Sequence, residues 1–178
     1  HFVSAPIFRR KFTAQETDRA EILIGAAGFY KLFVNGKDVT KGELAPYISN
    51  TDDIVYYDSY DVSNYINEGE NVVAVLLGNG FQNNPGGSAW DFDKARWRSA
   101  PKFAMRLSLV AEDETVNNIE SDESFKVCDS PILFDDFRCG EYYDARLAPQ
   151  ETIITMDYPT IRPIGNVSGI DAIAKYVE

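Results

Sequence analysis

Runs of strand-forming apolar residues alternate with short turn signals along most of the chain. Residues 20–24 and 29–34 are two such runs. Asn35-Gly36 follows directly and is typical of a type I′ hairpin turn, because both residues tolerate positive φ. Residues 54–60 predict another strand, and residues 103–110 alternate apolar and polar positions with period two. This rhythm predicts an all-β fold, an antiparallel β-sandwich or jelly roll.

Other segments add detail to this plan. Residues 72–77 are apolar on both faces, which predicts a central strand buried on both sides. Asp61–Ile66 resembles a single helical turn with Asp61 as its N-cap. A Gly- and Asn-rich loop is expected over residues 78–100, and loops of this length are usually functional or disordered. Short strands are expected at residues 116–119, 124–127 and 132–137, with residues 142–147 closing the sheet.

The pattern changes near residue 150. We expect a β-sandwich domain over residues 1–150 and a linker, or the start of a following module, over residues 151–178, where Pro159, Pro163 and Gly165 interrupt the chain. The sequence begins with His1 rather than Met, so we expect the natural start to lie upstream. The cellular compartment stays open.

Charge and composition restrict the classes of partner that the chain is expected to bind. The formal net charge is −11, from 17 basic and 28 acidic residues, which disfavours nucleic acid and anionic membrane surfaces. Neutral sugars and cations remain possible ligands. The one histidine is His1, which disfavours a zinc site or a histidine-dependent nucleophile. Cys128 and Cys139 could form a disulfide across neighbouring strands or remain free thiols.

The long loop offers candidate sugar ligands. Amides such as Asn79, with the indole of Trp90 nearby, would make a sugar-binding platform. The alternative is that Trp90 and Trp97 pin the loop onto the sandwich. Adjacent acidic pairs such as Asp135-Asp136 point to opposite faces of a strand, so they do not naturally flank one glycosidic bond.

Six short motifs occur in order along the chain: Gly28–Gly36, Leu44-Ala45-Pro46, Tyr57–Val62, Gly69–Val72, Leu77–Phe81 and Gly140–Leu147. Together they resemble the N-terminal domains of bacterial α-L-rhamnosidases. The resemblance spans about residues 20–147 and implies a galactose-binding-like jelly roll. It also implies a separate downstream (α/α)₆ barrel that hydrolyses terminal α-L-rhamnose with two carboxylates. Nothing in this chain resembles that barrel, so no catalytic residue is expected here.

The same resemblance implies a site for L-rhamnose assisted by calcium. Some members place an acidic pair shortly after the Leu-Ala-Pro motif, and the matching positions are Asp52 and Asp53, as sugar and calcium ligands. The family commonly has Trp where this chain has Ile48. The alternative is that both aspartates are solvated residues that initiate a turn.

Three interpretations follow. The first is a non-catalytic accessory domain that binds carbohydrate, L-rhamnose or a rhamnoside, for an α-L-rhamnosidase, with calcium as an optional partner rather than a required cofactor. The second is a structural domain that packs against the catalytic barrel of the same parent chain. The third, an autonomous enzyme, would need a cleft with two facing carboxylates, one with a raised pKa.

Overall fold

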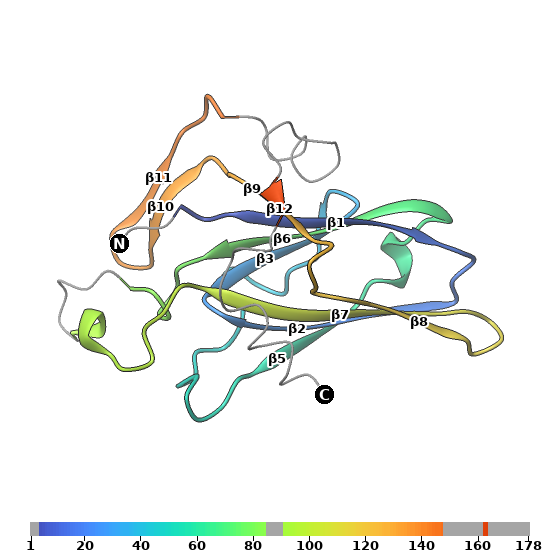
Figure 1. The fold of residues 1–178 in the computed structure, drawn as a ribbon, viewed down its shortest axis with the longest axis horizontal. Coiled ribbons are helices and arrows are strands. Elements are labelled where there is room, and N and C mark those ends of the chain that lie inside the picture. Colours follow the sequence, from blue (N-terminus) through green and yellow to red (C-terminus); the bar gives the residue numbers. More distant parts are fainter. Residues whose placement is uncertain (1–3, 85–90, 148–161, 164–178) are drawn as a thin grey trace.

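The computed structural model describes residues 4–84, 91–147 and 162–163, which form two packed antiparallel sheets and a hairpin (Figure 1). In spatial order, the six-stranded sheet contains β12 (Arg162–Pro163), β9 (Lys126–Cys128), β1 (Ile7–Ala14), β6 (Gly69–Gly78), β3 (Phe29–Val34) and β4 (Lys37–Asp38). The four-stranded sheet contains β5 (Tyr57–Asp61), β2 (Arg19–Ala27), β7 (Lys102–Val110) and β8 (Val116–Glu120). The hairpin is β10 (Ile132–Asp136) with β11 (Gly140–Tyr143), and two 3₁₀ turns are η1 (Ser63–Tyr65) and η2 (Phe92–Lys94). The predicted antiparallel β-sandwich is confirmed.

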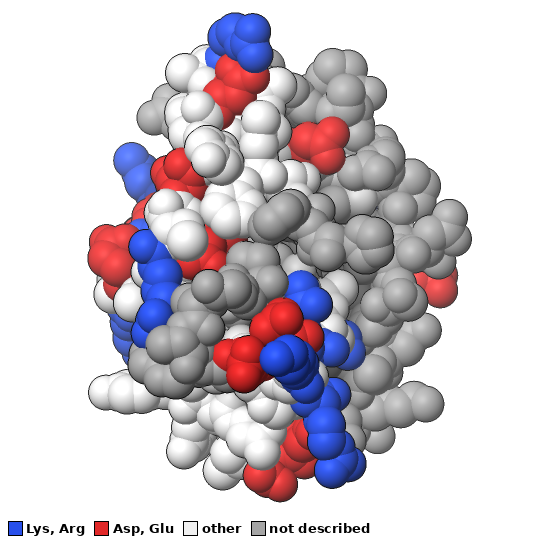
Figure 2. All heavy atoms as spheres, turned by 90° about the vertical axis from the view of Figure 1, so that its left-hand side faces the viewer, with Lys and Arg blue, Asp and Glu red and all other residues white. Residues whose placement is uncertain are grey.

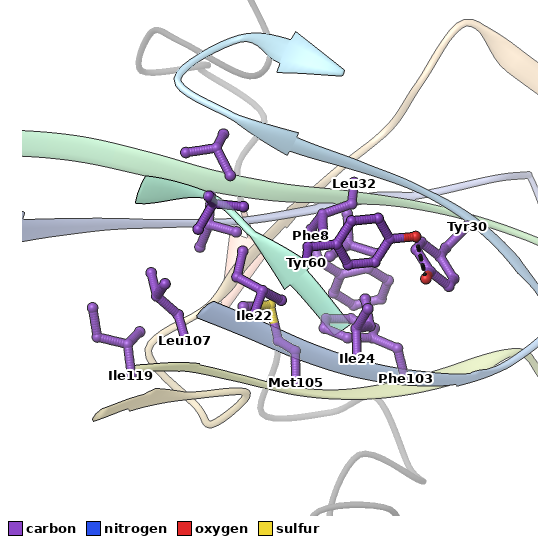
Figure 3. Packing of buried hydrophobic residues seen from close by; sticks show 14 of the residues in the cluster. Phe8, Ile22, Ile24, Tyr30, Leu32, Tyr60, Phe103, Met105, Leu107 and Ile119 are labelled. Carbon is purple, nitrogen blue, oxygen red and sulfur yellow. Dashed lines mark hydrogen bonds between the residues drawn. The ribbon is translucent and has the colours of Figure 1, made fainter. Parts of the chain in front are cut away.

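Successive strands cross between the sheets, so the main core lies between them. β1, β3 and β6 belong to one sheet, and β2, β5 and β7 belong to the other. Alternate residues of each strand point inward, as in Ile22, Ile24 and Leu107, all fully buried (Figure 3). None of the helices within the described part of the chain has the length and apolar character to cross a membrane.

The central strand β6 is buried on both faces, as residues 72–77 predicted. Val75 and Leu77 belong to the main core. Leu76, on the opposite face, belongs to a smaller cluster with Phe33 and the hairpin residue Ile132. The β10–β11 hairpin therefore covers part of the outer face of the six-stranded sheet, which explains why both faces of β6 are apolar.

One hydrogen-bonded group of polar side chains is built into the main core. The hydroxyl of Tyr30 lies 2.8 Å from that of Tyr60 (Figure 3) and donates to Asp58 Oδ2 at 2.5 Å. Burial, together with these neighbours, raises the pKa of Tyr30 far above its usual range. These bonds satisfy the phenols where the apolar core would otherwise leave them without partners.

Several local predictions need correction. β5 begins at Tyr57, because residues 54–56 form an exposed loop segment. Val62, not Asp61, occupies the N-cap of η1, while Asp61 Oδ1 accepts the Ser63 backbone N–H at 3.0 Å in a side-chain turn. The closing motif does not join either main sheet, because β11 pairs only with β10 among the described residues.

The chain also contains a strand, β1, that the pattern did not predict. Arg9, Arg10 and Lys11 interrupt its alternation, yet Phe8 enters the main core and Ile7 the smaller cluster. Cys128 and Cys139 are both free thiols; the first is buried and the second exposed. The predicted boundary at residue 150 and most of the predicted linker lie outside the described residues, although Arg162 and Pro163 pair with β9.

Candidate functional site

Several loops gather at the end of the sandwich where β6 ends and β7 begins (Figure 1). They include the segment leading into β5 and the segment between β6 and β7. Figure 2 looks onto this end, where the described side chains include acidic and basic groups that lie close to one another among uncharged ones.

One hollow beside these loops, which we call the loop pocket, has a volume of about 430 Å³. Its floor is the outer face of the four-stranded sheet, and its wall is the segment that precedes β5. The lining residues are Leu23, Ile24, Gly25, Thr51, Asp52, Asp53, Ile54, Val55, Tyr57 and Ala104. The floor is apolar, and the two carboxylates of Asp52 and Asp53 stand at its border.

A glycine lets the wall approach the floor. A Cβ added to Gly25 would lie 3.3 Å from the Tyr56 carbonyl oxygen and 3.6 Å from Val55 Cγ1. The first distance is tighter than most Cβ contacts and the second is an ordinary van der Waals contact, so a side chain at this position would press on the Tyr56 carbonyl. Tyr57, 70% exposed, continues the floor outward from the same register position on β5.

Asn50 organises the acidic turn. Its Oδ1 accepts the backbone N–H of Asp52 at 3.2 Å, and its backbone carbonyl accepts the N–H groups of Asp53 and Ile54 at 2.9 Å each. Its Nδ2 donates to Asp53 Oδ2 at 2.5 Å. The turn is therefore made by Asn50. Within residues 4–84 and 91–147, the Asp52 carboxylate accepts no hydrogen bond, so it is available to a ligand.

Side chains fasten this turn to the long loop. Thr51 Oγ1 donates to Gln82 Oε1 at 2.9 Å, and Gln82 Nε2 donates to the Trp97 carbonyl and to Ser99 Oγ. The Trp97 ring contacts Phe92, with centroids 5.9 Å apart. These contacts tie Trp97 to other residues of the long loop, and Thr51 ties the acidic turn to the same loop. That Trp97 pins the loop to the sandwich stays a prediction.

Comparison with known proteins places the chain in a family. Residues 15–166 match the family described as the α-L-rhamnosidase N-terminal domain. The chain belongs to this family. An α-L-rhamnosidase of Formosa agariphila is 36% identical over 146 residues, which is 80% of this chain and 15% of that protein.

Solved structures agree with this assignment. The crystal structure of Streptomyces avermitilis α-L-rhamnosidase complexed with L-rhamnose superposes with a TM-score of 0.80 at 26% identity, covering 91% of this chain and 16% of that one. The α-L-rhamnosidase of Dictyoglumus thermophilum gives 0.75 at 30% identity, covering 88% and 17%. This rhamnosidase N-terminal domain therefore corresponds to only a small part of its relatives.

The structure separates the predicted sugar ligands from one another. Asp52 and Asp53 border the loop pocket, whereas Asn79 is buried and is not among its lining residues. Asn79 donates to both carboxylate oxygens of Asp135, through its backbone N–H and its Nδ2, at 2.7 Å each. Its Oδ1 accepts from Asn83 at 2.7 Å. Trp90 lies outside the described residues.

A facing pair of carboxylates occurs at the β10–β11 hairpin of the rhamnosidase domain. Asp135 and Glu141 are register partners and both border a groove of about 460 Å³. Burial raises the pKa of Asp135, against the hydrogen bonds from Asn79 and Gly80. Asn79 donates to both oxygens of Asp135, so Asp135 ties the hairpin to the end of β6.

Asp52 and Asp53 are two of the oxygen ligands that a calcium ion could use. Calcium takes about six to eight oxygen ligands. Among the residues that the structure describes, no group of three or more acidic, histidine or cysteine side chains gathers around one point. Asp52 and Asp53 would supply only part of the coordination, so calcium binding stays a prediction.

The residues that form the pocket floor were not predicted from the sequence. Leu23 and Tyr57 point outward from β2 and β5, away from the core. A period-two count would place Leu23 opposite the buried Ile22 and Ile24, which was the available signal. The approach of Val55 over Gly25 had no such signal, because it depends on how the preceding loop folds back.

Proposed function

We propose that this domain is a non-catalytic carbohydrate-binding domain of an α-L-rhamnosidase, and that the loop pocket binds L-rhamnose or a rhamnoside. The observation that carries the proposal is the combination of two rim carboxylates, Asp52 and Asp53, with an apolar floor. A pocket of this size with few placed polar groups suits a small ligand.

The chemistry of L-rhamnose fits a pocket that combines an apolar floor with carboxylates at the rim. It is a 6-deoxyhexose, so one part of the ring carries a methyl group and other parts carry hydroxyls. The methyl group and the C–H face would pack on Leu23, Val55 and Tyr57. The hydroxyls would donate to Asp52 and to the oxygen of Asp53 that Asn50 leaves free.

The relatives support the substrate class. One solved relative is complexed with L-rhamnose, and the curated relatives are α-L-rhamnosidases. We propose that the parent protein hydrolyses terminal α-L-rhamnose through a catalytic barrel outside this chain, and that this domain holds rhamnosides near it.

Calorimetric titration of the chain with L-rhamnose tests the proposal. We expect measurable heat for the unaltered chain and a roughly 10- to 100-fold weaker affinity for Asp52→Asn, because one charge-assisted hydrogen bond contributes about 1.5–3 kcal/mol. Asp18→Asn, an exposed aspartate in the turn between β1 and β2, is the matched control and should bind like the unaltered chain.

The same titration separates the remaining predictions. Repeating it with calcium and then with chelator measures whether the metal contributes. Asn79→Ala measures whether Asn79 contacts sugar, which would require its carboxamide to leave Asp135 and Asn83. A flat trace at millimolar L-rhamnose would exclude the proposed site.

A second candidate function is packing against the catalytic barrel. Large apolar side chains of the hairpin are exposed: Leu133 by 48%, Tyr142 by 71% and Tyr143 by 56%. Tyr142 and Tyr143 follow each other along β11 and face opposite sides of the hairpin, and exposed apolar side chains of this size are candidates for an interface. The two functions use different surfaces, so they are compatible in one domain.

A further inference from the structure

A second hollow lies on the same outer sheet face as the loop pocket. We call it the serine hollow; its volume is about 310 Å³, and it is lined by Arg19, Ala20, Glu21, Ser59, Asp61, Ser63, Ser108 and Val110. Three hydroxyls, two carboxylates and one guanidinium surround it. Its polar lining contrasts with the apolar floor of the loop pocket.

Strand register makes the two hollows neighbours. The outward residues of β2 are Arg19, Glu21, Leu23 and Gly25; the first two line the serine hollow and the last two line the loop pocket. On β5, Tyr57 borders the loop pocket, and Ser59 and Asp61 border the serine hollow. At about 3.4 Å per residue, this track along β2 is roughly 20 Å long.

Two carboxylates face each other in the serine hollow. Glu21 and Asp61 are direct register partners on β2 and β5. Like charges directly opposite each other on a sheet are unfavourable. Each instead accepts from a serine hydroxyl: Ser59 Oγ donates to Glu21 at 2.5 Å, and Ser63 Oγ donates to Asp61 at 2.6 Å. The hollow is thus rich in acceptors, and a ligand with several hydroxyl donors complements it.

We propose that the serine hollow is a second sugar subsite, so that the outer face of the four-stranded sheet binds a neutral oligosaccharide whose terminal rhamnose occupies the loop pocket. This inference rests on the proposed function of that pocket. The paired carboxylates disfavour an acidic glycan, and the hydroxyl-rich lining suits an uncharged one. The ligand class is therefore a rhamnose-terminated chain of two or more neutral sugars.

Titrations with L-rhamnose and with rhamnose di- and trisaccharides test the subsite. We expect the trisaccharide to bind at least 10-fold more tightly than the monosaccharide. Ser108→Tyr fills the serine hollow from the outward face of β7 and should remove this gain while leaving L-rhamnose affinity unchanged. Thr13→Tyr is the matched control, since Thr13 is an exposed residue of β1 in the other sheet and does not line the hollow.

The outcomes separate the two proposals. If L-rhamnose binds but affinity does not rise with chain length, or if the gain survives in Ser108→Tyr, the second subsite is excluded and the loop pocket stands. If no sugar binds, both proposals fail. Glu21→Gln adds no bulk and should lower trisaccharide affinity selectively, which keeps the test valid if Ser108→Tyr does not fold.

Discussion

At the scale of single residues, one recurring role of the described aspartates is to form turns. In six of the fourteen, the carboxylate accepts the backbone N–H two residues further along the chain: Asp38, Asp61, Asp113, Asp122, Asp136 and Asp144. This is the side-chain turn typical of Asp and Asn. In the turn beside the loop pocket, Asn50 takes that role, which leaves Asp52 and Asp53 for other partners. Sequence alone does not distinguish these roles, because both kinds of aspartate stand in polar loops.

Asp144 provides a direct test of these local bonds. The side chain of Arg146, followed by its backbone N–H, lowers the pKa of Asp144 to about 2. Because the folded-state pKa lies below the ordinary value of 3.8, the resulting stabilisation is present above that value and is lost as the pH falls toward about 2. We expect Arg146→Gln to move the carboxyl titration, followed by NMR, toward 3.8.

Asp113 is the internal control for that titration. Its pKa is lowered by the hydrogen bond from the Thr115 backbone N–H, so it should not respond to Arg146→Gln. An Asp144 midpoint already near 3.8 in the unaltered chain would show that the ion pair seen here does not persist in solution.

At the scale of elements, a strand could be predicted from the sequence where its own apolar pattern is clear. β3 and its Asn35-Gly36 turn were predicted closely, and both turn residues have positive φ, at 49° and 78°. β6 was predicted because its apolar run is unbroken. β1 was missed because three charges hide its alternation, and the pairing of β11 with β10 alone was missed because strand partners are set by tertiary packing.

The two faces of β6 allow a matched prediction. Leu77 faces the main core and is 2% exposed, whereas Leu76 faces the hairpin and is 9% exposed. We expect Leu77→Ala to lower the free energy of unfolding by about 3–5 kcal/mol and Leu76→Ala by about 2–3 kcal/mol, because the smaller cluster can collapse more easily. Urea unfolding measures both values.

Amide hydrogen exchange gives a second measurement for the same pair. Leu76 shares its cluster with Ile132, so Leu76→Ala should speed exchange in β10 more than Leu77→Ala does. Equal exchange in the two variants would mean that the hairpin does not depend on this cluster.

At the scale of the whole molecule, the two sheets offer different outer faces. The hairpin covers part of the six-stranded sheet, whereas the four-stranded sheet leaves both hollows open. Composition allowed neutral sugar binding without locating it, because a pocket arises only when a loop folds over a particular sheet face. The exposed hairpin residues then lie on a separate surface, available for the rest of the parent protein.

A substitution at Tyr142 tests whether the exposed hairpin residues form a docking surface. In the isolated chain, we expect Tyr142→Ser to change the free energy of unfolding by no more than about 0.5 kcal/mol, as for most exposed positions. In the full-length parent protein, the proposed docking predicts that the same change lowers the thermal unfolding midpoint of this domain, because it would remove apolar contact with the rest of that protein. Val116→Ser, at a 53% exposed position on β8, should have little effect in either protein. Equal, small effects of both variants in the full-length protein would exclude Tyr142 from the docking surface.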